Sequence, residues 1–279
     1  MIDTLHTLTE IQPPRNYRNI SSLNEIADYI KLRFEENGLE VSFQEYTIFG
    51  FTYKNVIGVM NPDNKRTLIV GGHYDVQGNK PGADDNASAV AGLVETSKIL
   101  KDKNLDLRIE FVAFTLEEPP FFGTKKMGSY IHANSIKNRT DIIGMINYEM
   151  IGFFSDEEWS QEYPLSLKLI MKDVKFPTTG DFIAFVSNKN SEDFLNSLNI
   201  ENTQKDIKTF ELVIPKFIEK KTASDHLNYW KFDIPAIMIT DTAYFRNKNY
   251  HKKTDSIDTL NLLKMKQVIE LTAKLIEEL

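Results

Sequence analysis

The chain opens with a helical pattern of hydrophobic residues. Apolar side chains recur every three or four positions between residues 22 and 38, at Leu23, Ile26, Ala27, Ile30 and Phe34. Ser22 and Glu25 have the spacing of a capping box before this pattern, and Gly38 follows it. The spacing predicts an amphipathic helix with one face against a core.

Strand patterns come next. Residues 39–49 and 53–60 alternate apolar and polar side chains, and the turn 61–65 leads into the continuous apolar run 67–72. Alternation is typical of strands with one solvent face, whereas a short unbroken apolar run is typical of a strand buried on both faces. We expect a hairpin beside a buried strand.

The rest of the chain alternates between the two patterns. We expect strands at 107–116, 141–150, 181–188 and 234–241, and helices at 87–100, 125–134, 191–199 and 258–279. This alternation predicts an α/β fold, with helices on both faces of a mixed, mostly parallel sheet. Because no repeat or Pro/Gly/Ser-rich linker divides the sequence, we expect a single domain over residues 1–279.

Composition narrows the classes of function. The 279 residues include 40 acidic and 33 basic side chains, a formal charge of −7, which does not suit a nucleic-acid or anionic-membrane surface. There are no cysteines, so any metal site must use His, Asp and Glu. The first residues lack a basic segment followed by an apolar one, and no apolar run approaches about 18 residues, so we expect a cytoplasmic protein.

Acidic residues and histidines follow four of the predicted strands. They are His73 and Asp75, Glu117 and Glu118, Glu149, and Asp241 with the later His251 and Asp255; Asp84 and Asp85 lie in the loop before the helix at 87–100. Sites in such sheets lie beyond the carboxyl ends of the strands, so these groups are expected to converge. Imidazole and carboxylate ligands suit Zn²⁺, Mn²⁺ or Co²⁺, and this set is large enough for two ions that share a carboxylate.

Each feature alone also has an ordinary explanation. A His-x-Asp pair after a strand is common, "ADDN" at 83–86 is typical of a turn with a helix cap, and "EE" before two prolines is typical of a solvated loop. The order and spacing of the whole set favour the metal site. His6, in an N-terminal arm or helix, and His132, expected on the polar side of a short helix, are assigned no role.

The sequence resembles a known family at six segments. These are "GGHYD" at 71–75, "PGADDNAS" at 81–88, "LEEPP" at 116–120, "NYEMIG" at 147–152, "ASDHLNYW" at 223–230 and "NYHKKTDSID" at 249–258. Together they resemble the zinc aminopeptidases, co-catalytic di-zinc metallopeptidases related to glutamate carboxypeptidase and glutaminyl cyclase. The resemblance implies a three-layer α/β/α sandwich on a sheet of about eight strands.

The resemblance also implies a ligand set for two zinc ions. His73 and Glu149 would hold one ion, Glu118 and His251 the other, and Asp85 would bridge them. Many relatives carry Asp where this chain has Glu149; the extra methylene still allows ligation, but would shift the ion beside His73 or lower its affinity. Relatives also tend to have a cis peptide bond after the bridging aspartate.

Further roles follow from the same resemblance. Glu117 would be the general base, Tyr250 would stabilise the oxyanion, and Asp75 would orient the imidazole of His73. Asp225 and His226 would support the site without necessarily touching metal. The implied activity is hydrolysis of peptides at a free N-terminus.

The residues that would contact the substrate are predicted less directly. Five side chains could line an apolar pocket for the first residue, although Phe pairs at loop starts are at least as often core: Phe121, Phe122, Met127, Phe153 and Phe154. Arg246 could bind a substrate carboxylate, or form a salt bridge with Asp241 or Asp255.

Two other functions remain open from the sequence. A glutaminyl cyclase-like acyltransferase with one zinc would share the fold, but such enzymes typically have Trp before the last histidine ligand, where this chain has Tyr250. A metal-free interaction protein would also share it, but the chain keeps a coordinating group at every ligand position.

Overall fold

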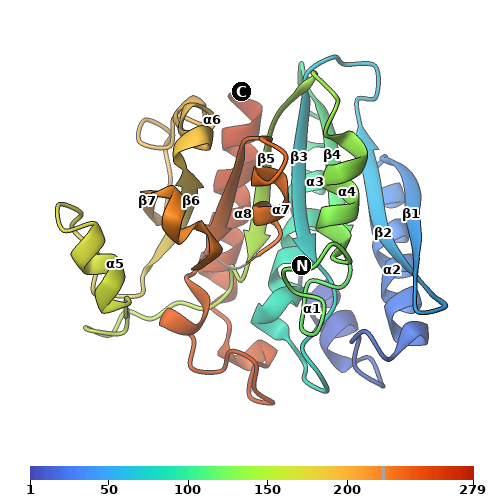
Figure 1. Cartoon of the computed structure of the whole chain (residues 1–279), viewed down its shortest axis with the longest axis horizontal. Coiled ribbons are helices and arrows are strands. Elements are labelled where there is room, and N and C mark those ends of the chain that lie inside the picture. The colour runs from blue at the N-terminus through green and yellow to red at the C-terminus, as the bar shows by residue number, and fades with distance from the viewer. Residues whose placement is uncertain (222–223) are drawn as a thin grey trace.

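Eight strands form one mixed sheet in the order β1-β2-β4-β3-β5-β8-β6-β7 (Figure 1). The strands are β1 (Glu40–Ile48), β2 (Phe51–Met60), β3 (Thr67–His73), β4 (Arg108–Phe114), β5 (Ile142–Glu149), β6 (Phe182–Asn188), β7 (Lys208–Ile214) and β8 (Ala236–Thr240). Four of the seven neighbouring pairs are parallel. The structure is a computed structural model that describes residues 1–221 and 224–279.

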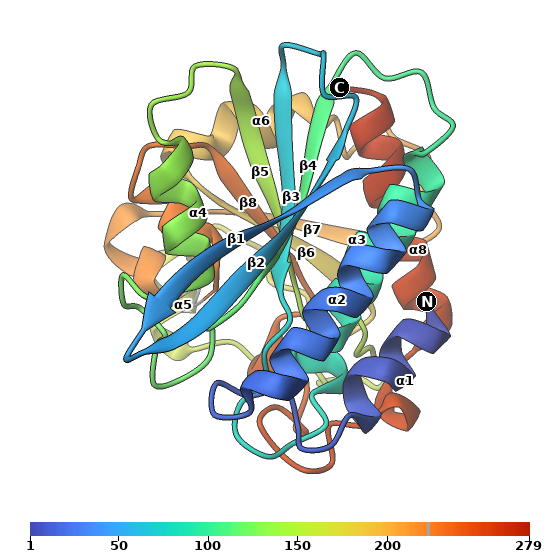
Figure 2. The ribbon, with the colours of Figure 1, turned by 90° about the vertical axis from the view of Figure 1, so that its right-hand side faces the viewer.

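Helices cover both faces of this sheet (Figure 2). The helices are α1 (Ile2–Glu10), α2 (Ile20–Glu36), α3 (Ala89–Leu100), α4 (Gly128–Ile136), α5 (Leu165–Ile170), α6 (Glu192–Ser197), α7 (His226–Trp230) and α8 (Leu262–Glu277). Helices α1, α2, α3, α6 and α8 pack on one face, and α4 and α7 pack on the other. The expected α/β fold is confirmed.

Strand β3 is buried along its whole length and sits in the middle of the sheet. Leu68 and Val70 belong to the core on one face, and Ile69 belongs to the core on the other. Gly71 leaves no side chain there: a Cβ would lie 2.4 Å from the Phe114 ring of β4. The run of apolar residues therefore predicted the central strand correctly.

Some predictions were wrong or incomplete. Helix α2 begins at Ile20 after Asn19, so Ser22 lies inside the helix and the predicted capping box is wrong. Strand β7 was missed because it is a half-exposed edge strand whose apolar pattern is diluted. His132 is buried, not on a polar face, and its Nδ1 lies 2.7 Å from the Tyr229 hydroxyl.

The carboxyl ends of the parallel strands β3, β4, β5 and β8 all lie at the lower edge of the sheet in Figure 1. The turn of the β1–β2 hairpin and the long loop between β4 and α4 reach the same edge. Within the described residues, no helix is both long and apolar enough to cross a membrane.

Candidate metal centre

Two groups of potential metal ligands meet at this edge. His73, Asp85 and Glu149 form one group, and Asp85, Glu118 and His251 form the other; within each group the ligand atoms lie within 4.8 Å of one another. These five residues are the ligand set expected from the sequence. Their side chains leave β3, β5 and three separate loops, so only the folded chain brings them together.

Asp85 belongs to both groups. Its Oδ1 lies 3.4 Å from Nε2 of His73, and its Oδ2 lies 3.0 Å from Nε2 of His251. The second histidine also lies 3.2 Å from Oε2 of Glu118. One carboxylate with an oxygen toward each histidine has the arrangement of a bridging ligand.

The loop that carries Asp85 is fixed from several directions. The Asp255 carboxylate accepts hydrogen bonds from the backbone amides of Asp84 and Asp85, at 2.9 and 3.1 Å. Gly82 has φ +60°, and a Cβ there would lie 2.4 Å from the Asp85 carbonyl oxygen, so the loop needs glycine. The Asp85–Asn86 peptide bond is cis, as the resemblance implied.

The tautomer of His73 can be assigned from its partners. Nδ1 lies 3.2 Å from the backbone carbonyl of Asp75, which can only accept, so Nδ1 carries the hydrogen. In the neutral imidazole Nε2 is then the nitrogen that can bind a metal, and it faces Asp85 and Glu149 at 3.4 and 3.5 Å. Among the described residues this buried nitrogen has no hydrogen-bond partner, as a metal ligand requires.

Asp75 also organises the next loop. Its two carboxylate oxygens accept hydrogen bonds from the amides of Glu117 and Glu118, at 3.0 and 3.2 Å. The carboxylate itself is 3.6 Å from Nδ1 of His73, so the imidazole is oriented mainly by the carbonyl. Asp75 therefore links the positions of a histidine and two glutamates.

Glu117 lies beside the centre, with Oε2 3.8 Å from Nε2 of His73. Burial raises the pKa of Glu117 well above its usual range; His73 opposes this and Glu149 adds to it. Glu118 differs: burial and Asp85 raise its pKa to about 8, and its buried Oε1 has no hydrogen-bond partner among the described residues. Glu118 thus belongs to a ligand group, whereas Glu117 lies next to the centre.

Without cations, this cluster holds protons. Burial lowers the pKa of His251, but hydrogen bonds to Asp85 and Glu118 outweigh it and raise the pKa to about 9. Burial also lowers the pKa of His73, and the carboxylates of Glu117 and Glu149 outweigh it. Carboxylates and imidazoles buried this closely fit divalent cations, which take the place of the protons.

Glu149 is held by residues that the sequence did not single out. Ser224 donates a hydrogen bond of 2.6 Å to its Oε2, and Asn147 in turn donates to the Ser224 hydroxyl at 2.8 Å. Asn86, next to Asp85, also donates to Glu149 at 3.3 Å. The longer side chain at this position is therefore anchored on one oxygen.

Three other predicted residues lie around the centre. The Tyr250 ring stacks on His251 with centroids 3.8 Å apart, and burial raises the pKa of its hydroxyl. Asp225 is fully buried, and burial raises its pKa to about 7. His226 packs edge-on against Trp230 and belongs to neither ligand group.

Arg246 is buried among acceptors of the protein itself. Its side chain is only 2% exposed, and it donates to Gln161 and to the carbonyls of Phe153 and Phe182. Neither predicted salt bridge forms among the described residues, because these neutral acceptors surround the guanidinium instead. Arg246 is a structural cross-link between loops.

An apolar cavity of about 130 Å³ opens beside Glu149 and Tyr250. Its walls come from α5, β6, β7, β8 and the loop after β8, and include Leu167, Val186, Phe210, Met238 and Tyr244. None of the five side chains predicted to line a pocket contributes to it. Phe121 lines a different cavity at the same edge of the sheet, and the apolar cavity is built from segments between residues 149 and 250, which a local pattern cannot bring together.

Arg15 is a further residue that the sequence analysis missed. It is fully buried and donates to four backbone carbonyls, at 2.6–2.8 Å: Leu8 of α1, Tyr74 after β3, and Pro81 and Gly82 before Asp85. The guanidinium thus joins the two loops that carry His73 and Asp85. Burial lowers its pKa to about 10, so it remains charged at neutral pH.

Comparison with known proteins places this centre in a family. Residues 55–276 match peptidase family M28, a range that includes both ligand groups. The chain belongs to peptidase family M28. It is therefore a metal-dependent peptidase, in agreement with the resemblance read from its motifs.

Individual relatives support this placement. The M28 chain is 39% identical over 276 residues to the protein YfbL of Escherichia coli K12, covering 96% of this chain and 84% of that one. It is 31% identical to aminopeptidase YwaD of Bacillus subtilis over 104 residues, only 22% of that protein.

Solved structures show the same fold. The LapA aminopeptidase of Legionella pneumophila superposes with a TM-score of 0.75 at 18% identity, over 99% of this chain and 70% of that one. Fimbriiglobus ruber glutaminyl cyclase superposes with a TM-score of 0.70 at 18% identity, over 100% and 94% of the chains. These two likenesses concern the fold alone.

Proposed function

We propose that this protein is a zinc aminopeptidase, which uses two zinc ions to remove N-terminal residues from peptides. The observation that carries the proposal is the pair of three-residue ligand groups that share Asp85. His73, Asp85 and Glu149 would hold one ion, and Asp85, Glu118 and His251 the other. Bound zinc would supply a water activated near neutral pH and a polarised substrate carbonyl.

Glu117 is the proposed general base. Its carboxylate lies beside the first ligand group without belonging to either group. Its pKa, raised by burial and by neighbouring carboxylates, falls again when cations offset those charges. Glu117 then accepts the proton of the attacking water and passes it to the leaving amine.

Tyr250 and the apolar cavity complete the proposed site. The Tyr250 hydroxyl would donate a hydrogen bond to the oxyanion of the substrate carbonyl. The cavity beside Glu149 and Tyr250 would take the side chain of the N-terminal residue, so an apolar first residue is preferred. The acidic residues around the centre suit the α-amine of a free N-terminus.

A pair of adjacent variants tests the proposal. Purified protein is assayed for bound zinc and for hydrolysis of leucyl anilide, a leucyl peptide and its N-acetylated form. We expect Glu117→Gln to keep zinc and to lose about 10²–10⁴-fold in kcat, whereas Glu118→Gln loses zinc.

Three results would contradict the proposal. They are hydrolysis that resists chelation, hydrolysis that Glu117→Gln leaves unchanged, and hydrolysis of the N-acetylated peptide at the rate of the free one. A peptide with N-terminal glutamine, tested for cyclisation in the same assay, separates the acyltransferase alternative.

A further inference from the structure

A second cavity, of about 520 Å³, lies at the same edge of the sheet. It is enclosed by the loop before α2, the tip of the β1–β2 hairpin and the loop after Glu118. The lining residues that matter here are Tyr17, Arg18, Phe49, Phe51, Phe121 and Lys126. No ligand of the metal centre lines it, so it is a separate site.

The inner wall of this cavity is aromatic and well fixed. Phe121 packs edge-on against Tyr17 at 5.4 Å and against Tyr53 at 6.4 Å. The Tyr53 hydroxyl donates to the Tyr17 carbonyl at 2.8 Å, which joins the hairpin to the loop before α2. Three segments far apart in the sequence therefore build one preformed surface.

The outer wall is the hairpin tip, which exposes two aromatic rings. Phe49 is 77% exposed and Phe51 is 56% exposed. Phe49 and Gly50, the two loop residues, both have positive φ, at +52° and +83°. Two-residue turns of this kind favour Asn or Asp at the first position, and a bulky ring there is an unfavourable choice for folding alone. Such a choice is typical of a residue retained for binding.

Two cations border the aromatic surface. The Lys126 ammonium lies 3.9 Å from the centroid of the Phe49 ring and 5.9 Å from that of Phe121, and the Arg18 guanidinium lies 5.3 Å from that of Tyr17. Neither cation pairs with a carboxylate within the part of the chain that the structure describes, although acids outnumber bases overall. Arg18 donates from Nε to the Tyr17 hydroxyl at 2.8 Å, and its two terminal nitrogens and the Lys126 ammonium are left for an anion.

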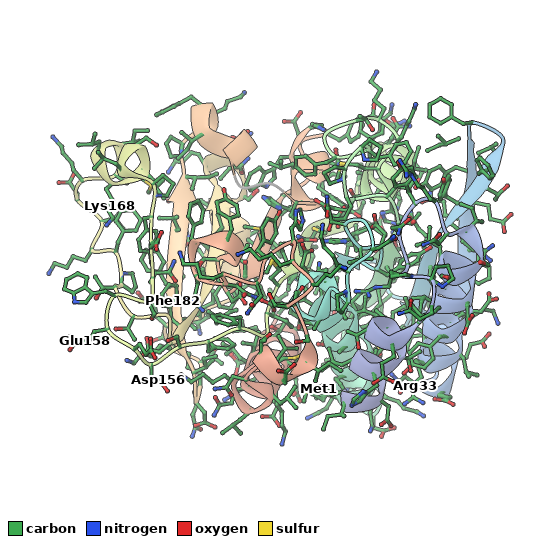
Figure 3. The ribbon with its side chains drawn as sticks, turned by 90° about the horizontal axis from the view of Figure 1, so that it is seen from below. Met1, Arg33, Asp156, Glu158, Lys168 and Phe182 are labelled. Carbon is green, nitrogen blue, oxygen red and sulfur yellow. The ribbon has the colours of Figure 1, made fainter. Side chains whose placement is uncertain are left out.

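The metal centre lies between the two cavities. The apolar cavity is on the β8–β6–β7 side, and the aromatic cavity is on the β1–β2 side. Figure 3 views this edge from below, with Lys168 of α5 at one end and Arg33 of α2 at the other. The aromatic cavity begins close to the centre, because the amide of Phe121 donates to the carbonyl of Glu118 at 3.0 Å.

We propose that the aromatic cavity binds the leaving side of a short peptide substrate, and this inference rests on the proposed aminopeptidase function. A large apolar or aromatic side chain would pack against Phe49, Phe51 and Phe121. The C-terminal carboxylate would bind Arg18 and Lys126. Among the residues that the structure describes, no lysine or arginine lines the apolar cavity, so charge complementarity sets the direction of the peptide across the centre.

The test compares peptide acids with peptide amides. Leu-Phe and Leu-Ala-Phe are each prepared with a free carboxylate and as the amide, and kcat/KM is measured for all four. We expect the acid form of at least one peptide to be favoured by about 10-fold, the effect of charge-assisted hydrogen bonds. In the double variant Arg18→Met/Lys126→Met the acid-to-amide ratio should fall to about 1, since both cations are gone. Lys125→Met, the same change at an exposed neighbour outside this cavity, should keep the wild-type ratio.

A binding measurement separates this inference from the proposed activity. The same four peptides are titrated by calorimetry into Glu117→Gln, where no turnover is needed. An acid preference that the double variant abolishes supports the cavity assignment even if no peptide is hydrolysed. Equal ratios in wild type and double variant would overturn it, while leucyl anilide hydrolysis would still support the aminopeptidase.

A second copy of the chain is the other occupant to test. Sedimentation of the wild type and of Phe49→Ser gives the oligomeric state. A wild-type dimer that becomes monomeric in the variant would show that this surface is an interface and would overturn the substrate assignment.

Discussion

Replacement of Arg15 by lysine should loosen the metal centre without removing any ligand. Arg15 donates four hydrogen bonds to backbone carbonyls from one planar guanidinium. A lysine keeps the charge, but its single ammonium cannot reach carbonyls that surround the guanidinium on several sides. At least two of the four hydrogen bonds are lost.

The magnitude follows from those bonds. A hydrogen bond from a charged group contributes about 1.5–3 kcal/mol, so two lost bonds lower the free energy of unfolding by about 3–6 kcal/mol. For a chain of this size, each kcal/mol of unfolding free energy corresponds to roughly 2 °C, so the melting temperature should decrease by about 6–12 °C. Zinc affinity should fall about 10-fold, because the loops after β3 and before Asp85 lose their common anchor.

Denaturant unfolding in chelator measures the stability, and competition with a zinc indicator measures the affinity. Arg18→Lys is the matched control, since this exposed arginine should change the stability by less than about 0.5 kcal/mol. If Arg15→Lys unfolds within about 1 kcal/mol of the wild type and binds zinc normally, Arg15 does not anchor these loops.

Three further predictions concern the centre itself. Tyr250→Phe should lower kcat about 10–100-fold with little change in KM or zinc content, because the proposed role of the hydroxyl is to stabilise the oxyanion; a rise in KM with no loss of kcat would argue for ground-state binding instead. Ser224→Ala removes the 2.6 Å hydrogen bond to Glu149 and should weaken one of two zinc equivalents about 10-fold, seen as a second, shallower step in a zinc titration. In chelator, the pKa of Glu118 is raised from 4.5 to about 8 by burial and Asp85, and that of His251 from 6.5 to about 9 by its carboxylate partners, which outweigh burial. The folded state therefore binds protons at these two groups more tightly than the unfolded state does, and this stabilisation is lost as the pH rises to about 9. The gain in melting temperature on adding zinc should consequently grow between pH 5 and pH 9. A gain that stays constant with pH would contradict these shifts.

The sequence predicted the parts of the site that local pattern controls. A strand end is set by the period of its side chains, so His73 and Glu149 could be located from the apolar runs before them. Glu118 and Asp85 could be located from short motifs with a fixed order along the chain. The convergence of these residues then followed from the parallel arrangement of β3, β4 and β5.

Other features depend on contacts that a linear pattern does not encode. Arg15 acts through backbone carbonyls, which every residue has, so no partner in the sequence marks its role. The apolar cavity needs walls from α5, β7 and β8, which are brought together only by the crossovers of the sheet. Arg246 stands five residues before His251, close enough to suggest a substrate contact, yet its side chain turns into the protein.

The shared position of Asp85 limits how this centre can change during evolution. With two ions bound as proposed, a substitution at Glu149 or Glu118 would remove a ligand from one group and lower the affinity of one ion alone. A substitution at Asp85 removes a ligand from both groups in a single step. If the proposed centre loses one ion, the glutamate of that group is free to vary, whereas the remaining group still needs Asp85.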